Sequence, residues 1–427
     1  MVRNYQKSDY IAAILFSLTT AVRLGLGLVV VKIIASEGGP EGLGLLGQFM
    51  GVLAILSTFA GGGISTGLTK YVAQKRSQNL DSTIYLQTAL AITLFSGILF
   101  AIIIFLSANW GSKLLFGTDA YSSIIVLLSI FQIFIGLNNF SLAVMNGRKD
   151  VVGFSAATIL GSISGVVGMY LVTQNGRVDS LMFGMLLFSS STVLFSPIFL
   201  WFRHKEFRHA FKPIYSSLAA HKLIGFSGMQ LVTVLTLPMA QIFIRSVIEG
   251  RYGWDVVGYW QGINKISDAY LQFFLVFLGN YFLPRLAETA RTEELKGLVF
   301  DLLKIIVPIC IASTVIIYVT RYFFIDLLFS SAFTAMADYF AFQLIGDVFK
   351  ISAYTLVFVA ISRAMFKVMI CAEILQSLML ILFTWIGAFY CGPIGLVRGY
   401  AVTYVLYFSV ALLTFLYFSR RSKLDLD

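Results

Sequence analysis

The sequence predicts an all-α integral membrane protein, and two observations carry this prediction. Of its 427 residues, 58% are hydrophobic and only 12% are charged, whereas a soluble domain has roughly 25% charged residues. The apolar residues are also gathered in runs of about 20, the length that a helix needs to cross the hydrocarbon core of a bilayer. These runs do not alternate between apolar and polar residues, so they predict helices rather than the strands of a membrane barrel.

We expect about twelve membrane-spanning helices. Their approximate ranges are 10–34, 43–69, 83–108, 121–145, 151–173, 180–202, 223–248, 256–283, 297–320, 339–361, 368–390 and 393–418. The first is too long for the apolar region of a signal peptide and shows no clear cleavage site, so we expect it to stay in the mature protein. The three cysteines are widely spaced, which is not the pattern of a disulfide framework or of a Cys-rich metal site.

The loops between the spans differ in their content of Lys and Arg. Twenty of these residues fall in one set of alternate loops and only four in the other set. Because cytoplasmic loops carry an excess of positive charge, this split predicts an even number of spans with both termini in the cytoplasm. The formal net charge of +10 then reflects orientation in the membrane, and we do not expect nucleic acid as a partner.

Two halves of six spans each are predicted, at 1–202 and 223–427, joined by a cytoplasmic linker at 203–222. Spans one and seven both begin in the cytoplasm, so an internal repeat would be parallel. Gln48 and Gln261 lie at similar depths of the second and eighth spans, which supports such a repeat. All three histidines fall in the linker, and we interpret them as part of a solvated basic loop rather than a metal site.

Ionisable residues within the spans are the candidates for function. A charged side chain at the bilayer centre costs roughly 2.5–3.5 kcal/mol on insertion scales, so it persists where it faces protein or a water-filled cavity. Polar residues at helical spacing form one stripe in the tenth span and another in the eighth. These stripes are Gln343, Asp347, Lys350 and Tyr354, and Gln261, Asn264, Lys265, Asp268 and Gln272.

Two interpretations of these stripes stay open. Asp347 with Lys350, and Lys265 with Asp268, are opposite charges three residues apart, which suits ion pairs that lock helices together. Alternatively, the stripes line one shared polar cavity. We favour the cavity because both stripes occur in the second half of the chain.

Two arginines add to this set. Arg23 lies in the middle of the first span and has no residue of opposite charge nearby in the sequence, which favours a cavity position. Arg245 shares one face of the seventh span with Gln241, in a helix that Pro238 is expected to bend.

Glycines in two other spans invite different interpretations. The run 61–63 and Gly67, near the cytoplasmic end of the second span, are a candidate flexible point for gating. Gly161, Gly165 and Gly168 fit the pattern of small residues that lets helices pack closely.

We find no sign of an enzyme in the sequence. It has no phosphate-binding loop, no His/Glu zinc motif and no nucleophile elbow, so we predict no catalytic residue, no metal and no cofactor. The predicted loops on the non-cytoplasmic side are short, whereas a glycan polymerase or ligase is expected to carry a sizeable one.

Three stretches resemble Wzx-type lipid-linked oligosaccharide flippases, the polysaccharide transporter branch of the MOP exporter superfamily. They are GGPEGLGLLGQF through GLTKYVAQ (38–74), YGWDVVGYWQGINKISDAYLQF (252–273) and FTAMADYFAFQLIGDVFK (333–350). The resemblance is strongest to the members that serve the synthesis of enterobacterial common antigen and of O-antigen, and it covers nearly the whole chain.

The resemblance implies a V-shaped fold of two six-helix lobes around a cationic cavity, in the bacterial inner membrane. It implies as substrate an undecaprenyl-pyrophosphate-linked oligosaccharide, and as further partners the glycan polymerase and chain-length regulator of the same pathway. The implied substrate-binding residues are Arg23, Arg245, Lys265 and Lys350 for phosphates or acidic sugars, Asp268 and Asp347 for charge balance, sugar hydroxyls or a coupling proton, and Gln261 and Gln343 beside them. Asn264-Lys265 stands where the family is expected to have small neutral residues, which implies a different lining of the cavity in this chain.

Two rival functions from other classes stay open. A cation-coupled exporter of drugs or metabolites would share the fold, and it would expel small cations. A membrane enzyme of glycan assembly would change the covalent structure of a lipid-linked sugar.

Overall fold

The computed structural model describes residues 2–78, 80–204, 212–225, 227–289 and 291–424. Within these ranges it does not describe the side chains of 2–13, 227–233, 292 and 420–424. The centre of the predicted linker, 205–211, therefore lies outside the described residues.

The described residues form helices and short turns and contain no strand, which confirms the all-α prediction. Nine helical stretches among them are long and apolar enough to cross a membrane. Two of these stretches, of 47 and 54 residues, are each long enough for two crossings, since about 20 residues span a bilayer. The count of twelve spans and the cytoplasmic termini stay predictions.

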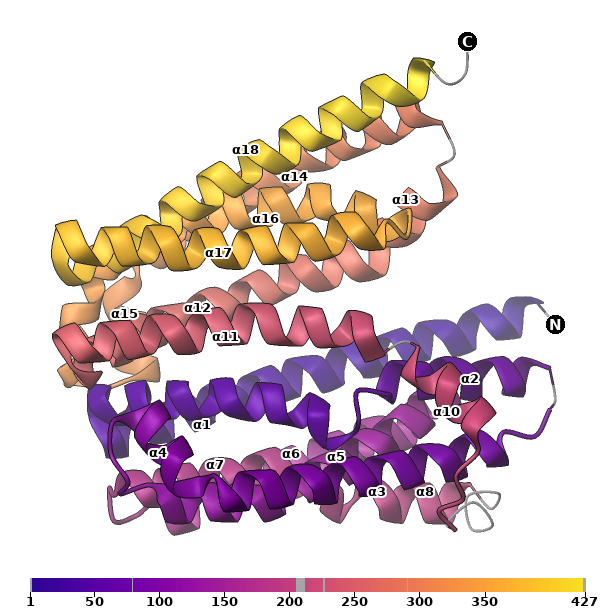
Figure 1. The fold of residues 1–427 in the computed structure, drawn as a ribbon. Coiled ribbons are helices and arrows are strands. Elements are labelled where there is room, and N and C mark those ends of the chain that lie inside the picture. The colour runs from indigo at the N-terminus through magenta and orange to yellow at the C-terminus, as the bar shows by residue number, and fades with distance from the viewer. Residues whose placement is uncertain (1, 79, 205–211, 226, 290, 425–427) are drawn as a thin grey trace. The chain divides into compact units, whose positions relative to one another are not determined.

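The chain forms two compact units, the first made of residues 1–38 and 48–235. Within it α3 packs against α5, and α6 packs against α7. Its helices are most of α1 (Val2–Ala60), then α2 (Ser65–Ser77), α3 (Thr83–Leu106), α4 (Ala108–Phe116), α5 (Ser122–Gly147), α6 (Val151–Val172), α7 (Val178–Ser190), α8 (Ser196–Arg203), α10 (Ser217–Ile224) and the start of α11 (Ser227–Tyr252) (Figure 1).

The long helix α1 is interrupted between the first two predicted spans. Gly39 has φ 59° there, a left-handed conformation that glycine adopts without steric cost, and Pro40 follows it. Residues 39–47 belong to the second unit, where they pack on α12 (Trp254–Phe277). A Cβ atom on Gly258 of α12 would lie only 1.9 Å from the carbonyl oxygen of Pro40, so this packing requires glycine.

The structure assigns different roles to the two glycine groups. The run 61–63 breaks the helix between α1 and α2, with Gly62 and Gly63 at positive φ; its part in gating stays a prediction. A Cβ atom on Gly161 would lie 2.4 Å from Cα of Thr192. This close approach confirms the packing role predicted for Gly161.

The second unit consists of residues 39–47 and 236–427. Within it α18 packs against both α16 and α17 (Figure 1). Its helices are the rest of α11, then α12, a π-helical turn (Leu278–Phe282), α13 (Leu283–Glu288), α14 (Thr292–Val319), α15 (Arg321–Leu328), a 3-10 segment (Ser331–Tyr339), α16 (Phe340–Ser362), α17 (Phe366–Cys391) and α18 (Gly395–Leu424).

The crossing of α17 and α18 depends on glycine. A Cβ atom on Gly387 would lie 2.0 Å from the carbonyl oxygen of Gly395. We therefore expect Gly387→Val to lower the thermal stability of the purified protein, by about 1–3 kcal/mol or more, because the added methyl groups force the two backbones apart. The reaction of buried Cys310 with a fluorogenic thiol reagent on heating, in a variant without the two exposed cysteines, would measure it.

The matched control is Gly297→Ala in α14. Nothing lies within 4 Å of a Cβ atom at Gly297, so this change is expected to leave the melting temperature unchanged or raise it slightly, since alanine favours helix over glycine. Equal melting temperatures for Gly387→Val and the wild type would contradict the packing account.

Candidate functional site

A buried carboxylate lies at the centre of the second unit. Asp347 on α16 has a relative exposure of 0%. Its Oδ2 atom accepts hydrogen bonds from the hydroxyls of Ser267 at 2.6 Å and Tyr270 at 2.7 Å, and its Oδ1 atom accepts one from Tyr400 at 2.7 Å. Since the donors come from α12 and α18, Asp347 links three helices.

Lys350 lies one helical turn along α16 from Asp347. Its Nζ atom is 5.8 Å from the ring centroid of Tyr400 and 5.5 Å from that of Tyr404, within the range of a cation–π contact. The Gln376 amide of α17 donates to the hydroxyls of Tyr354 and Tyr404, both at 3.0 Å. The tyrosines are therefore held in place around the ammonium group.

A pocket of about 240 Å³ opens beside Lys350. Its lining residues are Asp268, Leu271, Gln272 and Leu275 from α12 and Lys350, Ile351 and Tyr354 from α16. The two predicted polar stripes therefore meet at one cavity. Because pockets for whole small ligands measure about 300–1,000 Å³, this one suits a charged or sugar-sized part of a larger ligand.

The charges around the pocket are not arranged as simple ion pairs. Among the described side chains, neither Asp347–Lys350 nor Lys265–Asp268 forms a salt bridge. Asp268 is exposed and interacts electrostatically with three cations: Arg245, Lys265 and Lys350. This geometry agrees better with a shared polar cavity than with two local ion pairs.

Arg245 is a buried cation, and two of its hydrogen-bond donors have no acceptor among the described residues. It is 4% exposed, and its Nη2 atom donates to Gln261 at 2.9 Å and to Gln241 at 3.3 Å. Its guanidinium lies 5.7 Å from the ring centroid of Trp260. The Nε and Nη1 atoms find no hydrogen-bond partner in the described part of the chain. A buried donor without a partner costs about 1–3 kcal/mol, so Arg245 is a candidate anion position.

The remaining predicted residues do not line the pocket beside Lys350. Gln343 is buried and donates to Ser267 at 3.2 Å and to Asn264 at 3.4 Å, so it belongs to the Asp347 cluster. Lys265 is half-buried, and no described group accepts a hydrogen bond from it. Arg23 belongs to the first unit; its side chain is exposed and has no polar partner among the residues described.

On α12 and α17, three residues of this cluster escaped the sequence analysis. Ser267 and Tyr270 lie three residues apart on α12 and both donate to Asp347. Gln376 is the amide that α17 contributes to the tyrosines. A lone amide in the middle of an apolar span was the signal for Gln376, because such a group needs a partner in the membrane.

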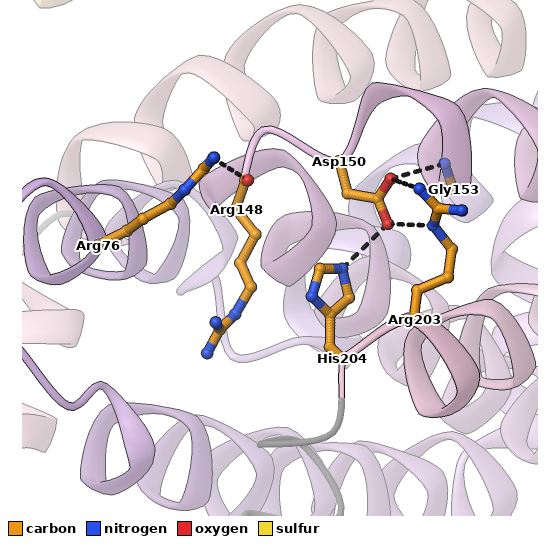
Figure 2. A network of polar contacts seen from close by, with 6 residues as sticks. All are labelled: Arg76, Arg148, Asp150, Gly153, Arg203 and His204. Atoms are coloured by element: carbon orange, nitrogen blue, oxygen red, sulfur yellow. Dashed lines mark hydrogen bonds and ion pairs between the residues drawn. The ribbon is translucent and has the colours of Figure 1, made fainter. Parts of the chain in front are cut away.

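A second polar network lies in the first unit, in the turn before α6 (Figure 2). The Asp150 side chain, 6% exposed, accepts the backbone N–H of Gly153 at 3.0 Å, which caps α6. Nε and Nη2 of Arg203 both donate to it at 2.8 Å, and Nε2 of His204 lies 3.0 Å away. Burial alone would raise the pKa of Asp150, but the hydrogen bonds from Arg203, Gly153 and His204 outweigh it and lower that pKa below its usual value.

Asp150→Asn is expected to destabilise the first unit by about 1–2 kcal/mol, since Arg203 is partly exposed and its bond is screened. Because the folded-state pKa lies below the unfolded value of about 3.9, this stabilisation is complete above about pH 4 and is lost as pH falls through the folded-state pKa. Melting temperatures measured from pH 3 to pH 8 would test this, with His204→Gln in both proteins to remove the imidazole. A difference in melting temperature between the Asp150→Asn variant and its parent that grows as the pH falls would contradict this account.

The fold is shared with solved membrane transporters. The lipid II flippase MurJ in an inward closed conformation matches with a TM-score of 0.73, at 17% identity over 94% of this chain and 87% of that chain. An inward-facing multidrug resistance MATE family transporter of the MOP superfamily also matches with a TM-score of 0.73, at 16% identity over 95% and 98% of the two chains. The chain therefore shares its fold with these two proteins.

Sequence comparison places the chain within a family. Residues 39–338 match the model of a polysaccharide biosynthesis protein family. The chain is 35% identical over 405 residues to the lipid III flippases of Escherichia coli (strain K12) and Shigella flexneri, covering 95% of this chain and 97% of each relative. It therefore belongs to the polysaccharide biosynthesis protein family, in its Wzx-type flippase branch, and is a transporter rather than an enzyme.

Proposed function

We propose that this protein moves an undecaprenyl-pyrophosphate-linked oligosaccharide from the cytoplasmic to the periplasmic leaflet of the bacterial inner membrane. The observation that carries the proposal is the 35% identity to lipid III flippases over 95% of the chain. The buried Arg245 and the half-buried Lys265 and Lys350 of the second unit provide the chemistry, because a pyrophosphate brought into a low-dielectric site needs positive charge around it.

The polar cluster divides into groups that bind and groups that hold the structure. Lys350 faces the pocket and rests on tyrosine rings, so its ammonium is available to a phosphate. Asp268 and Gln272 face the same pocket and suit sugar hydroxyls. Asp347 is buried and already accepts three hydroxyl donors, so we assign it a positioning role and make Asp268 the carboxylate that meets substrate or a coupling ion.

Transport would follow from alternating exposure of this cluster to the two sides of the membrane. The headgroup enters from the cytoplasmic leaflet while its lipid chain stays in the bilayer, and Arg23 of the first unit adds a further cation for it. The sequence has no nucleotide-binding motif, so energy comes from an ion gradient or from consumption of the product. The polymerase that consumes it and the chain-length regulator of the same pathway are the proposed protein partners.

A deletion strain that also lacks other flippases of this family tests the function. An undecaprenyl-pyrophosphate-linked oligosaccharide with an intact repeat unit should accumulate, and wild-type protein should relieve the accumulation, whereas Arg23→Ala and Arg245→Ala should not. Unchanged surface glycan without accumulation would overturn the proposal in favour of a small-molecule exporter. A covalent change of the lipid-linked sugar by the purified protein would favour an enzyme.

A further inference from the structure

An apolar groove of about 550 Å³ lies between α16, α17 and α18 of the second unit. It is formed by residues from 356–360, 365–375 and 407–418, and nearly all of its lining side chains are apolar. Its volume falls in the range of about 300–1,000 Å³ that is usual for ligand pockets.

The groove is about as long as one leaflet is deep. It follows the end of α16, the beginning of α17 and the last turns of α18, all at the side predicted to be cytoplasmic. The eleven residues 365–375 extend about 15 Å along the helix axis, which is half of the hydrocarbon thickness of about 30 Å.

The two ends of the groove differ in character. Lys367, at the start of α17, lines the outer end; it is exposed and has no polar partner in the described part of the chain. At the inner end, Tyr407 and Leu375 line the groove, and each neighbours a residue of the hydrogen-bonded pair Tyr404–Gln376. The groove therefore runs from a headgroup-level cation to the edge of the polar cluster.

We propose that this groove binds the polyprenyl chain of the lipid-linked substrate in the cytoplasmic leaflet, with Lys367 beside its first phosphate. The proposal rests on the proposed function. A single long chain with an anionic end matches one apolar groove with one cation at its outer end. A phospholipid has two chains, so its second chain would lie outside the groove. Met365 and Met369 line the groove, and their flexible, polarizable side chains adapt to a methyl-branched chain.

Two free cysteines of α17 allow a direct test. Cys371 lines the groove, whereas Cys391 lies at the opposite end of the helix and does not; both are exposed. Single-cysteine proteins in nanodiscs would be treated with a membrane-permeant maleimide, with and without undecaprenyl phosphate. We expect undecaprenyl phosphate to slow the labelling of Cys371 at least fivefold and to leave Cys391 unchanged. Equal rates with and without the lipid, or equal protection by phosphatidylglycerol, would overturn the proposal.

Filling the groove gives an independent readout. Ala372→Trp places a large ring in the groove, whereas Leu413→Trp on α18 puts the same ring on an exposed residue that does not line it. We expect Ala372→Trp to abolish the protection of Cys371 and to lower flipping at least tenfold, and Leu413→Trp to change neither. Equal effects of the two variants would contradict the assignment.

Failure of this proposal can be told apart from failure of the proposed function. If the wild-type protein flips the lipid-linked sugar while Cys371 stays unprotected, the groove is not the binding site for the chain and the function stands. If undecaprenyl phosphate protects Cys371 but no lipid-linked sugar is flipped, the groove stands as a polyprenyl site and the function falls.

Discussion

Replacing Lys350 by alanine is expected to lower flipping by roughly 10- to 100-fold without unfolding the protein. A hydrogen bond to a charged group contributes about 1.5–3 kcal/mol, and each 1.4 kcal/mol corresponds to about tenfold. Lys350 faces the pocket and forms no salt bridge among the described residues. Its loss removes attraction for substrate phosphate, while Asp347 keeps its three hydroxyl donors and Asp268 keeps Arg245 and Lys265 nearby. Accumulated lipid-linked oligosaccharide in complemented cells, normalised to protein level, would measure the effect.

Lys304→Ala is the matched control for this charge change. Lys304 is also a lysine within a long helix of the second unit, but its Nζ atom pairs with exposed Asp301 at 2.9 Å and lines none of the described pockets. We expect flipping to be unaffected by Lys304→Ala and partly retained in Lys350→Arg. If Lys350→Ala flips as fast as Lys304→Ala, the phosphate role of Lys350 is wrong.

Asp347→Ala is expected to destabilise the second unit by about 2–5 kcal/mol, because it leaves the three hydroxyls of Ser267, Tyr270 and Tyr400 without their shared acceptor. The three donors lie 2.6–2.7 Å from the carboxylate, so the helices α12, α16 and α18 would lose their common contact. Thermal exposure of Cys310, which is buried in the same unit, would report the loss.

Tyr400→Phe provides a graded comparison, since it removes one donor and keeps the acceptor and the ring. We expect it to destabilise the protein less than Asp347→Ala does. Asp347→Asn should keep the pH dependence of transport, since Asp347 is assigned a positioning role. If that dependence disappears while the melting temperature stays near the wild-type value, Asp347 carries the coupling proton and the assignment to Asp268 is wrong.

Much of the fold could be predicted because lipid imposes a simple rule on sequence. Backbone groups must pair internally and apolar side chains must fill about 20 positions, so runs such as 83–108 and 151–173 coincide closely with α3 and α6. The sequence also predicted the meeting of the two polar stripes. Asp268 and Lys350 are 82 positions apart, yet line one pocket.

Other parts of the site could not be predicted, for physical reasons. The opposite charges at Asp347 and Lys350 have the spacing of an ion pair, but side-chain rotamers decide where each group points. Here the carboxylate accepts hydrogen bonds from hydroxyl groups, and the ammonium group lies against tyrosine rings. The apolar groove left no trace in the sequence, because residues that line it and residues that face lipid have the same apolar composition.

The central claim is most directly tested with purified protein in liposomes that contain the lipid-linked oligosaccharide isolated from the deletion strain. The sugar in the outer leaflet is removed with an enzyme that cannot cross the membrane, and the fraction that stays protected is measured over time. Transport predicts that protection, initially about half, falls toward zero with the wild-type protein and much more slowly with Lys350→Ala, while the uncleaved lipid keeps its covalent structure. Protection that stays the same in liposomes with and without the wild-type protein would contradict the claim.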